Sequence, residues 1–395
     1  MKFGSKSSFE LSKAFDIYMS EVGGDFKFAM QTVNETDYFL ALRSKLLSGE
    51  KVDLFNFSSA NELSALREHV RELNNYEWIG KAFEASLEAA IIDSRVQGVP
   101  YCMEATGFLC NQDMFDYAGI PILEADSIDK LNDAFSELNE KIISGEMAEK
   151  FPELTAVTEF PALDRSFLEK TFSDIALGAT FRSVLEAAMA ESLVVDEESP
   201  AEDILKLMLR FSPSGNSWTK SMSVTHSMQL ERFAKMGVAV ILSDTGAYRQ
   251  MVGVNPQIKG RASLLPIPLP NFETPVIYLG APFYWAVNAS SSDKESEIAV
   301  NFLKWLYLSE TGAEYFAEEM GEASPFLDAS RDTGVLLHRQ MRGYISADMF
   351  LPQVHGALPP RWGKDVFAVN VQDYITKREV TWQDVVKNCQ EAWNP

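Results

Sequence analysis

The chain has 395 residues, of which 46% are hydrophobic, so it is too long for one ordinary core and apolar enough to form two domains. It carries 57 acidic and 35 basic residues, and the resulting net charge of −22 argues against binding to nucleic acid or to an anionic membrane surface. Its longest apolar runs, such as VAVILS at 238–243, are too short to cross a bilayer.

The common motifs of metal, phosphate and nucleophile sites are missing from the sequence. The four histidines are scattered, and there is no Gly-rich phosphate loop and no GxSxG element. The three cysteines, Cys102, Cys110 and Cys389, form no CxxC pair, and small core residues are their simplest interpretation. We therefore predict no metal, no cofactor and no catalytic residue, while an enzyme with an unfamiliar motif stays open.

The first hundred residues alternate strand-like and helical patterns, which is typical of a parallel sheet flanked by helices. Strands are expected at 2–5, 26–33 and 52–59, with a helix between the first two. The carboxyl ends of strands line the ligand crevice in open α/β sheets. The loops that begin at Ser5 and at Phe57 are therefore expected to point at one site.

Residues 99–121, VPYCMEATGFLCNQDMFDYAGIP, resemble a buried strand that one carboxylate, Glu104, interrupts. A buried carboxylate without a partner is costly unless its pKa shifts until it is neutral. Either a protein group or a ligand must therefore satisfy Glu104.

The later elements have clearer boundaries. A helix is expected at 128–142 behind a cap at Asp126 or Ser127, and strands are expected at 238–243, 262–270 and 276–288. Two more helices are marked by residues in capping-box register, Ser292 with Glu295 and Thr381 with Asp384. A polar loop at 212–221 contains Trp218.

Four segments in this order resemble the extracellular solute-binding proteins (family 1) of ABC importers, in the carbohydrate-binding, maltose-binding-protein-like branch. They are the 99–121 stretch, LERFAKMGVAVILSDTGAYRQM, the segment from LLPIPLP through GEASPF, and VTWQDVVKNCQEAWN. In the first segment the matching residues are Asn111, Asp113, Phe115, Ala118, Gly119 and Ile120. One departure is the DTGAYRQ turn, where the family usually has a tryptophan and this chain has Tyr248.

The resemblance implies an α/β protein with a two-lobed, periplasmic-binding-protein-like fold. Each lobe is expected to be a mostly parallel sheet flanked by helices, and three hinge crossings join the lobes. Residues 1–107 and 264–322 would form the N-lobe, and residues 108–263 and 323–395 the C-lobe. A carbohydrate would bind between the lobes and be captured by their closure.

Sugars present hydroxyls, which donate and accept hydrogen bonds, and flat apolar faces, which stack on aromatic rings. Glu104 is expected to accept from two adjacent hydroxyls, and the alternative is that it pairs with an internal Lys or Arg. Phe57 is expected to stack on the ligand, and the alternative is a place in the core. The expected ligand-binding residues are Lys6, Ser7, Asn56, Phe57, Asn61, Glu104, Asp164, Arg165, Trp218, Asp244, Tyr248, Gly280 and Trp362.

The resemblance also implies the setting. We expect a monomer outside the cell or in the periplasm, anchored as a lipoprotein in its full-length form, that delivers an oligosaccharide to the permease subunits of an ABC transporter. The start of the chain shows no signal-peptide pattern. Two alternatives stay open: a binder of another small solute, such as a polyamine or a metal chelate, and a glycosidase with Glu104 and Asp244 as its carboxylate pair.

Overall fold

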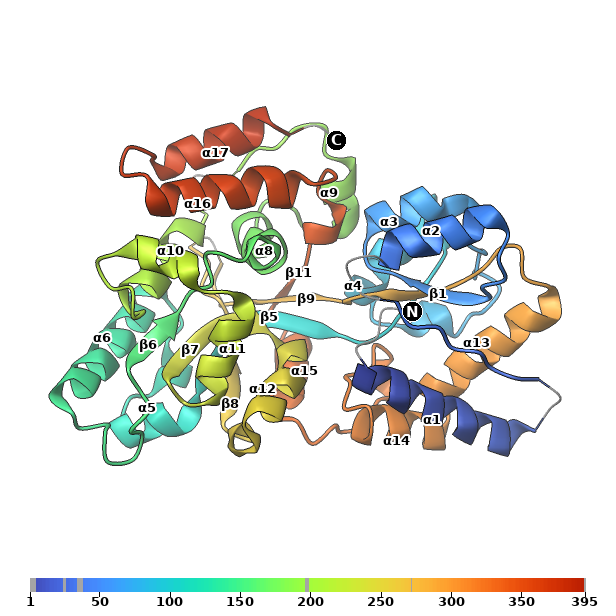
Figure 1. Ribbon diagram of the computed structural model, residues 1–395, viewed down its shortest axis with the longest axis horizontal. Helices are drawn as coiled ribbons and strands as arrows, with labels where there is room; N and C mark the ends of the chain where they lie inside the picture. Colours follow the sequence, from blue (N-terminus) through green and yellow to red (C-terminus); the bar gives the residue numbers. More distant parts are fainter. Residues whose placement is uncertain (1–4, 24–25, 34–37, 196–198, 271, 394–395) are drawn as a thin grey trace. The chain divides into compact units, whose positions relative to one another are not determined.

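The computed structural model describes residues 5–23, 26–33, 38–195, 199–270 and 272–393 (Figure 1). The chain forms two compact units. Unit 1 comprises Met1–Glu104 and Gly280–Gly334, and unit 2 comprises Ala105–Leu279 and Val335–Pro395. Among the described residues, no helix has the length and apolar character that crossing a membrane requires.

Unit 1 is built on a small antiparallel sheet. Its strands β1 (Leu54–Phe57), β10 (Tyr284–Val287) and β4 (Val99–Pro100) lie in the order β1-β10-β4. The main helices of the unit are α1 (Ser5–Val22), α2 (Tyr38–Ser48), α3 (Ala60–Leu66), α4 (Glu84–Leu87), α13 (Asp293–Leu308) and α14 (Glu310–Glu318). In the core, the Trp285 indole N–H donates to the Tyr307 hydroxyl at 3.0 Å, and that hydroxyl donates to the Tyr101 carbonyl at 2.8 Å.

Three expectations for unit 1 need correction. Segment 26–33 is not a strand, and Ser5 already belongs to α1, so no loop begins there; residues 2–4 of the first expected strand lie outside the described residues. The sheet is antiparallel rather than mostly parallel, because β10, from the far end of the chain, lies between β1 and β4. An apolar alternation indicates an extended chain but not the strand with which it pairs.

Unit 2 is a mixed sheet covered by helices. Its strands have the order β11-β9-β5-β7-β6, and β8 also pairs with β5. Pairs β11–β9 and β6–β7 are parallel, whereas β5–β7 and β5–β8 are antiparallel. The strands are β5 (Glu104–Asn111), β6 (Ala156–Glu159), β7 (Val238–Asp244), β8 (Ala262–Leu265), β9 (Ile277–Gly280) and β11 (Phe350–Pro352).

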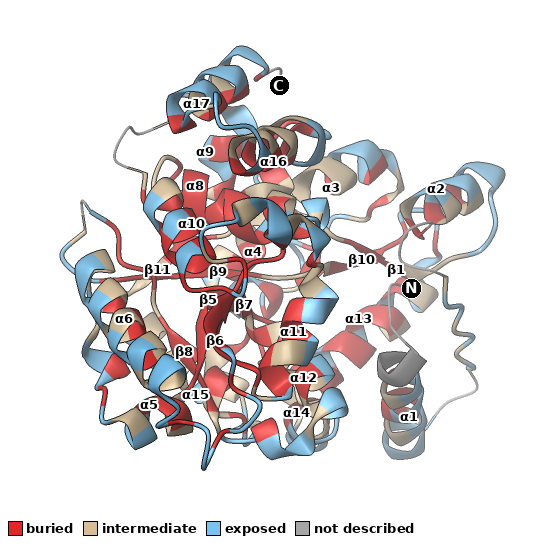
Figure 2. Cartoon of the chain, turned by 60° about the vertical axis from the view of Figure 1, so that its left-hand side comes forward, coloured by how far each residue is buried: buried red, intermediate tan, exposed pale blue. Residues whose placement is uncertain are grey.

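The helices of unit 2 enclose this sheet, and strands β5 and β7 are buried along almost their whole length (Figure 2). The larger helices are α5 (Gln112–Ala118), α6 (Ile128–Ser144), α10 (Ala201–Arg210), α11 (His226–Ala234), α12 (Tyr248–Val254), α15 (Leu336–Ser346), α16 (Ala368–Thr376) and α17 (Trp382–Glu391). Shorter helices are α7 (Arg165–Phe167), α8 (Ser173–Leu177) and α9 (Val184–Met189).

Several predicted boundaries agree with the structure. Ser127 caps α6, and both expected capping boxes are present, at the starts of α13 and α17. The chain passes from unit 1 to unit 2 after Glu104 and returns after Leu279, whereas the lobes expected from the sequence divide after 107 and after 263. Strand β8, half of which was expected in the other lobe, pairs with β5 and therefore belongs to unit 2.

The strand register of unit 2 brings polar residues that can form hydrogen bonds to one edge of the sheet. Thr106, near the start of β5, lies opposite Asp244, at the end of β7. Strand β6 runs parallel to β7, so its carboxyl end lies at the same edge. The Gln353 side chain, just after β11, donates to the Thr106 hydroxyl at 3.1 Å, which brings the end of β11 there too. We call this the strand-end edge of unit 2.

Candidate functional site

A histidine with two nearby carboxylates lies at the strand-end edge. His226, the first residue of α11, has its Nε2 atom 3.1 Å from the buried Ser243 hydroxyl. Its backbone N–H donates to the Asp164 carboxylate at 3.3 Å. Asp244 follows Ser243 at the end of β7, so the structure brings together two of the carboxylates expected from the sequence.

Burial sets the protonation state of this histidine. Desolvation lowers the pKa of His226 below its usual value, and the negative charges of Asp244 and Asp164 oppose that shift. The imidazole is therefore mostly neutral near pH 7, with one ring nitrogen that donates and one that accepts.

Local backbone structure holds both carboxylates in place. Asp164 caps α7 by accepting the N–H groups of Ser166 at 3.0 Å and Phe167 at 3.2 Å. Asp244 accepts the Ala247 N–H at 3.0 Å and so caps the short helix η8 (Thr245–Ala247). In Asp244 this bond uses Oδ1, and the remaining lone pairs of both carboxylates can accept further hydrogen bonds.

Threonine and amide groups continue the edge towards Glu104. The Thr245 hydroxyl accepts the Ala105 N–H at 3.1 Å. Glu104, the first residue of β5, is half-buried, and it is the residue at which the chain leaves unit 1. Its role as a ligand residue at a hinge crossing stays a prediction.

A second buried carboxylate in unit 2 has a structural role. Asp174 is 1% exposed and accepts the backbone N–H groups of Val354 at 2.7 Å and His355 at 2.8 Å. The Nδ1 atom of His355 lies 2.8 Å from its other oxygen. These contacts hold the turn after β11 against α8.

Two expected ligand residues lie against α16 instead of around His226. The Arg165 Nε group donates to the Gln372 side chain at 3.0 Å. Trp218 is half-buried, begins the short helix η7 (Trp218–Ser223), and has its ring centroid 6.0 Å from that of Tyr374. Both side chains remain partly open to solvent.

Tyr248 and Gly280 also lie at element ends. Tyr248 is the first residue of α12, and burial raises the pKa of its half-buried hydroxyl, which also has a backbone hydrogen bond with Gly260. Gly280 is the buried last residue of β9.

Four expected residues of unit 1 lie in β1, in α3 and within the bounds of α1. Asn56 is fully buried, and neither atom of its side-chain amide has a hydrogen-bond partner among the described residues. Asn61 lies half-buried in the first turn of α3. Lys6 and Ser7 fall within the bounds of α1, but their side chains lie outside the described residues.

The structure places two expected stacking residues in the core. Phe57 is fully buried, and its ring stacks on Tyr284 with 5.0 Å between centroids. Trp362 is 3% exposed, donates from its indole N–H to the Cys389 carbonyl at 3.1 Å, and packs edge-on against Trp393. Flanking Pro and Gly residues made Trp362 look like a loop residue, whereas it immediately precedes the turn η12 (Gly363–Phe367) that leads into α16.

Sequence reasoning missed His226, Ser243 and Gln353. The start of α11 could have been predicted, because Thr225 precedes His226 and its hydroxyl accepts the Met228 N–H as a helix cap. The contact between His226 and Ser243 could not, because it depends on how α11 packs on β7. Among the described residues, no group of three or more His, Cys, Asp or Glu side chains could hold a metal ion.

Comparison with known proteins gives a likeness in fold. No protein-family model matches the sequence, and no curated protein does. Among solved structures, the ligand-free form of RafE from Streptococcus pneumoniae has a TM-score of 0.76 at 15% identity, covering 100% of this chain and 96% of that one. The complex of RafE with raffinose has a TM-score of 0.72 at 16% identity, covering 99% of this chain and 97% of RafE.

Two further solved structures are similar in fold to this chain. A sugar transporter from Bacillus licheniformis in complex with stachyose has a TM-score of 0.66 at 15% identity and covers 99% and 97% of the two chains. A family 1 extracellular solute-binding protein from Bifidobacterium longum subsp. infantis has a TM-score of 0.68 at 16% identity and covers 99% and 96%. At these identities the likeness shows the fold, and this chain therefore has the α/β fold of the extracellular solute-binding proteins.

Proposed function

We propose that the protein is a solute-binding protein that captures an oligosaccharide for import by an ABC transporter. The observation that supports this most is the likeness in fold over 99% of the chain to RafE with raffinose and to a sugar transporter with stachyose. The match spans both units, so the likeness covers the two-unit fold and not one shared domain alone.

The chemistry of the strand-end edge is compatible with a sugar. Asp164 and Asp244 can accept from hydroxyl groups, and a neutral His226 can both donate and accept. Hydrogen bonds to charged groups contribute about 1.5–3 kcal/mol each, so two carboxylates held by helix caps provide affinity and orientation together. Outside this edge, the half-buried ring of Trp218, which lies against α16, is a second candidate surface for the apolar face of a sugar.

The remaining parts of the proposal concern the setting. We expect three hinge crossings and movement of the units on ligand binding. We also expect delivery of the ligand to permease subunits and an extracellular or periplasmic location. The likeness to a family 1 extracellular solute-binding protein favours that location. Binding energy would then shift an equilibrium between conformations, and no reaction is required.

The first test is a thermal-shift panel of di-, tri- and tetrasaccharides, followed by titration calorimetry of any ligand that raises Tm. A ligand at 100 times its Kd should stabilise the protein by about 2.7 kcal/mol. The panel should include raffinose, stachyose and chitin oligosaccharides, with a polyamine as the non-sugar arm. Binding of the polyamine alone, or release of hydrolysis products, would replace the proposal by one of its alternatives.

The second test addresses the site. Glu104→Gln and Trp218→Ala should each weaken sugar affinity about tenfold or more, because each removes a polar or stacking contact. Glu137→Gln and Tyr117→Ala, at exposed positions on α6 and α5, are matched controls and should leave affinity unchanged. Unchanged affinity in both site variants would show that the site lies elsewhere.

A further inference from the structure

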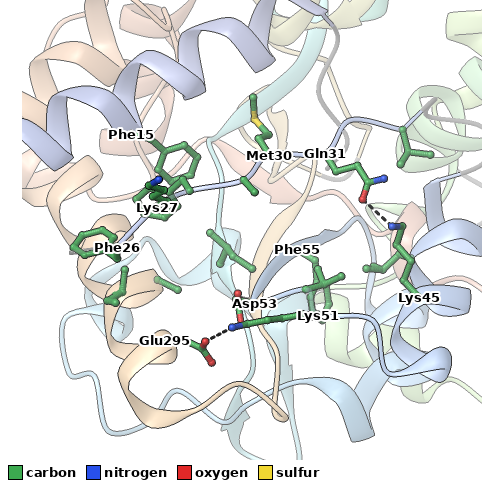
Figure 3. Close-up of a pocket in the computed structure, with 18 of the residues that line it drawn as sticks. Phe15, Phe26, Lys27, Met30, Gln31, Lys45, Lys51, Asp53, Phe55 and Glu295 are labelled. Atoms are coloured by element: carbon green, nitrogen blue, oxygen red, sulfur yellow. Dashed lines mark hydrogen bonds and ion pairs between the residues drawn. The ribbon is translucent and has the colours of Figure 1, made fainter. Parts of the chain in front are cut away.

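Unit 1 contains a pocket of about 520 Å³ whose charged groups are already paired (Figure 3). The Lys45 ammonium donates to the Gln31 side chain at 2.7 Å, and Lys51 pairs with Glu295. The residues that flank segment 26–33, which forms one wall, lie outside the described part of the chain. This pocket therefore gives no indication of a ligand, whereas unit 2 contains a carboxylate and an imidazole nitrogen without partners among the described residues.

The carboxylate belongs to Glu169. The residue is half-buried, and within the described part of the chain its side chain forms no hydrogen bond and no ion pair. Burial raises the pKa of this carboxyl; the charges of Lys170, Lys364 and His355 act in the opposite direction, and the charge of Asp365 adds to the rise. A partly desolvated carboxylate without donors gains most from a ligand that supplies them.

Two wide helical turns hold Glu169 in place. It lies in η6 (Leu168–Phe172), against which η12 packs, and both turns have the winding of a π-helix. A Cβ atom at Gly363 of η12 would lie 2.8 Å from the Glu169 Cγ, so a larger residue there would displace the Glu169 side chain. Single π-turns within helical segments are frequent at functional sites, which favours a role for Glu169 beyond packing.

The imidazole belongs to His355, two residues after Gln353 of the strand-end edge. Its Nδ1 lies 2.8 Å from the Asp174 carboxylate, its side chain is 26% exposed, and its Nε2 forms no hydrogen bond with the described residues. The carboxylate can only accept, so Nδ1 carries the proton, and Nε2 of the neutral ring is an acceptor. Two acceptors cannot satisfy each other, so Nε2 and the Glu169 carboxylate both need donors from elsewhere.

One helical segment links this pair of acceptors to His226. Phe167, at the end of α7, has its ring centroid 5.3 Å from that of the His226 imidazole. The charge of Lys170, three residues further on, acts on both His226 and Glu169. The strand-end edge thus carries a second group of polar side chains beside the group around His226.

We propose that Glu169 and His355 form a second subsite, in which they accept hydrogen bonds from two adjacent hydroxyls of one sugar unit while the carboxylates near His226 hold another unit. This inference rests on the proposed function and narrows it to a ligand of at least two units. It also predicts which units fit. A deoxy unit at this position leaves one acceptor without a donor and is rejected for that reason.

Sugar binding at this subsite depends on pH. Hydroxyl donors favour the ionised form of Glu169, so the bound carboxyl has a lower pKa than the free one, which burial raises. Binding therefore releases protons, and affinity rises with pH until the free carboxyl is ionised. Glu169→Gln should remove this part of the rise, while the part that belongs to His226 and its neighbouring carboxylates remains.

The test uses the whole protein and titration calorimetry between pH 4.5 and pH 7. The probe is whichever of raffinose, stachyose and the chitin oligosaccharides gives the largest rise in Tm. Glu169→Gln should bind it about tenfold more weakly at pH 7 and show a smaller rise in affinity with pH. His355→Asn keeps an N–H near the position of Nδ1 and removes Nε2, and it should bind about fivefold more weakly. Glu137→Gln, at an exposed position on α6, should change neither affinity nor its pH profile.

The possible outcomes separate this inference from the proposed function. Saccharide binding by the wild type with full affinity in either site variant overturns the subsite and leaves the proposed function standing. A weaker Glu169→Gln that keeps the whole rise in affinity with pH also overturns it, because the effect is then structural. If Glu169→Gln does not fold, as judged by circular dichroism, His355→Asn decides. Binding of no saccharide by the wild type removes the proposed function, and the subsite with it.

Discussion

Trp218 and Trp362 differ in what surrounds their rings. Trp362 lies among Phe367, Cys389 and Trp393 and is 3% exposed, with its indole N–H bonded to a backbone carbonyl. Trp218 is half-buried and touches Tyr374 from one side. The Trp362 ring therefore helps to hold η12, α16 and α17 together. The Trp218 ring could be removed without leaving a cavity in the core.

We predict that replacing each tryptophan by alanine lowers the free energy of unfolding by very different amounts. Trp362→Ala should lower the free energy of unfolding by about 3–5 kcal/mol, because it removes a buried ring and leaves a cavity. Trp218→Ala should cost about 1 kcal/mol or less, as is usual for partly exposed positions. Urea unfolding followed by circular dichroism measures both. Equal losses would mean that Trp218 also belongs to the core and is unsuited to ligand binding.

The carboxylates of unit 2 show which part of a site a sequence can reveal. The sequence predicts Asp244 because it follows a buried strand and Asp164 because it lies in an irregular loop, and the structure brings both close to His226. Nothing in the sequence around Asp174 and Glu159 indicates that these carboxylates are buried, yet both are. Asp174 accepts three hydrogen bonds, and Glu159 forms an ion pair with Arg232. Their partners come from distant parts of the chain, so spacing along the sequence carries no information about them.

The same limit applies to whole elements. Helices α6, α13 and α17 were located to within a few residues because their caps are local interactions, each within three residues of sequence. Strand pairing was not predictable, since β1 and β4 both pair with β10, which lies near the other end of the chain. Segment 26–33 has the alternation of a strand but no strand partner among the described residues, so pattern alone predicted it wrongly.

The cap of α17 gives a prediction at the scale of one element. The Thr381 hydroxyl accepts the Asp384 N–H at 3.2 Å and donates to the Asp384 carboxylate at 2.7 Å, and that carboxylate also accepts the Thr381 N–H at 2.8 Å. The bond from the hydroxyl, and after it the bond from the N–H, hold the pKa of Asp384 below its usual value. Thr381→Ala should destabilise the protein by about 1 kcal/mol. It should also raise the pKa of Asp384, which an NMR titration of its side chain would detect.

Lys387→Ala is the matched control, because Lys387 is an exposed residue of the same helix whose pairing with Glu391 spans 3.9 Å. An exposed pair of this kind is worth little, so the change in stability should be within about 0.5 kcal/mol. If Thr381→Ala and Lys387→Ala had equal effects, the cap would not be what begins α17.

At the scale of the whole molecule, excess negative charge acts on both units. The chain has 22 more acidic than basic residues, and many of its ion pairs are exposed, such as Lys130 with Asp126 and Lys387 with Glu391. Exposed pairs contribute little, so the long-range repulsion among the surplus carboxylates outweighs them. The folded state, which holds these charges closer together than the unfolded chain does, is destabilised by that repulsion.

Salt should therefore stabilise this protein. Raising NaCl from about 10 mM to about 200 mM shortens the Debye length from roughly 30 Å to below 10 Å and screens repulsion across each unit. We expect Tm at pH 7 to rise by a few degrees and then to level off, because screening is nearly complete at that point. A rise that continued in proportion to salt would indicate preferential exclusion of the salt instead. A fall in Tm would mean that the ion pairs, and not the net charge, dominate the electrostatic stability of the fold.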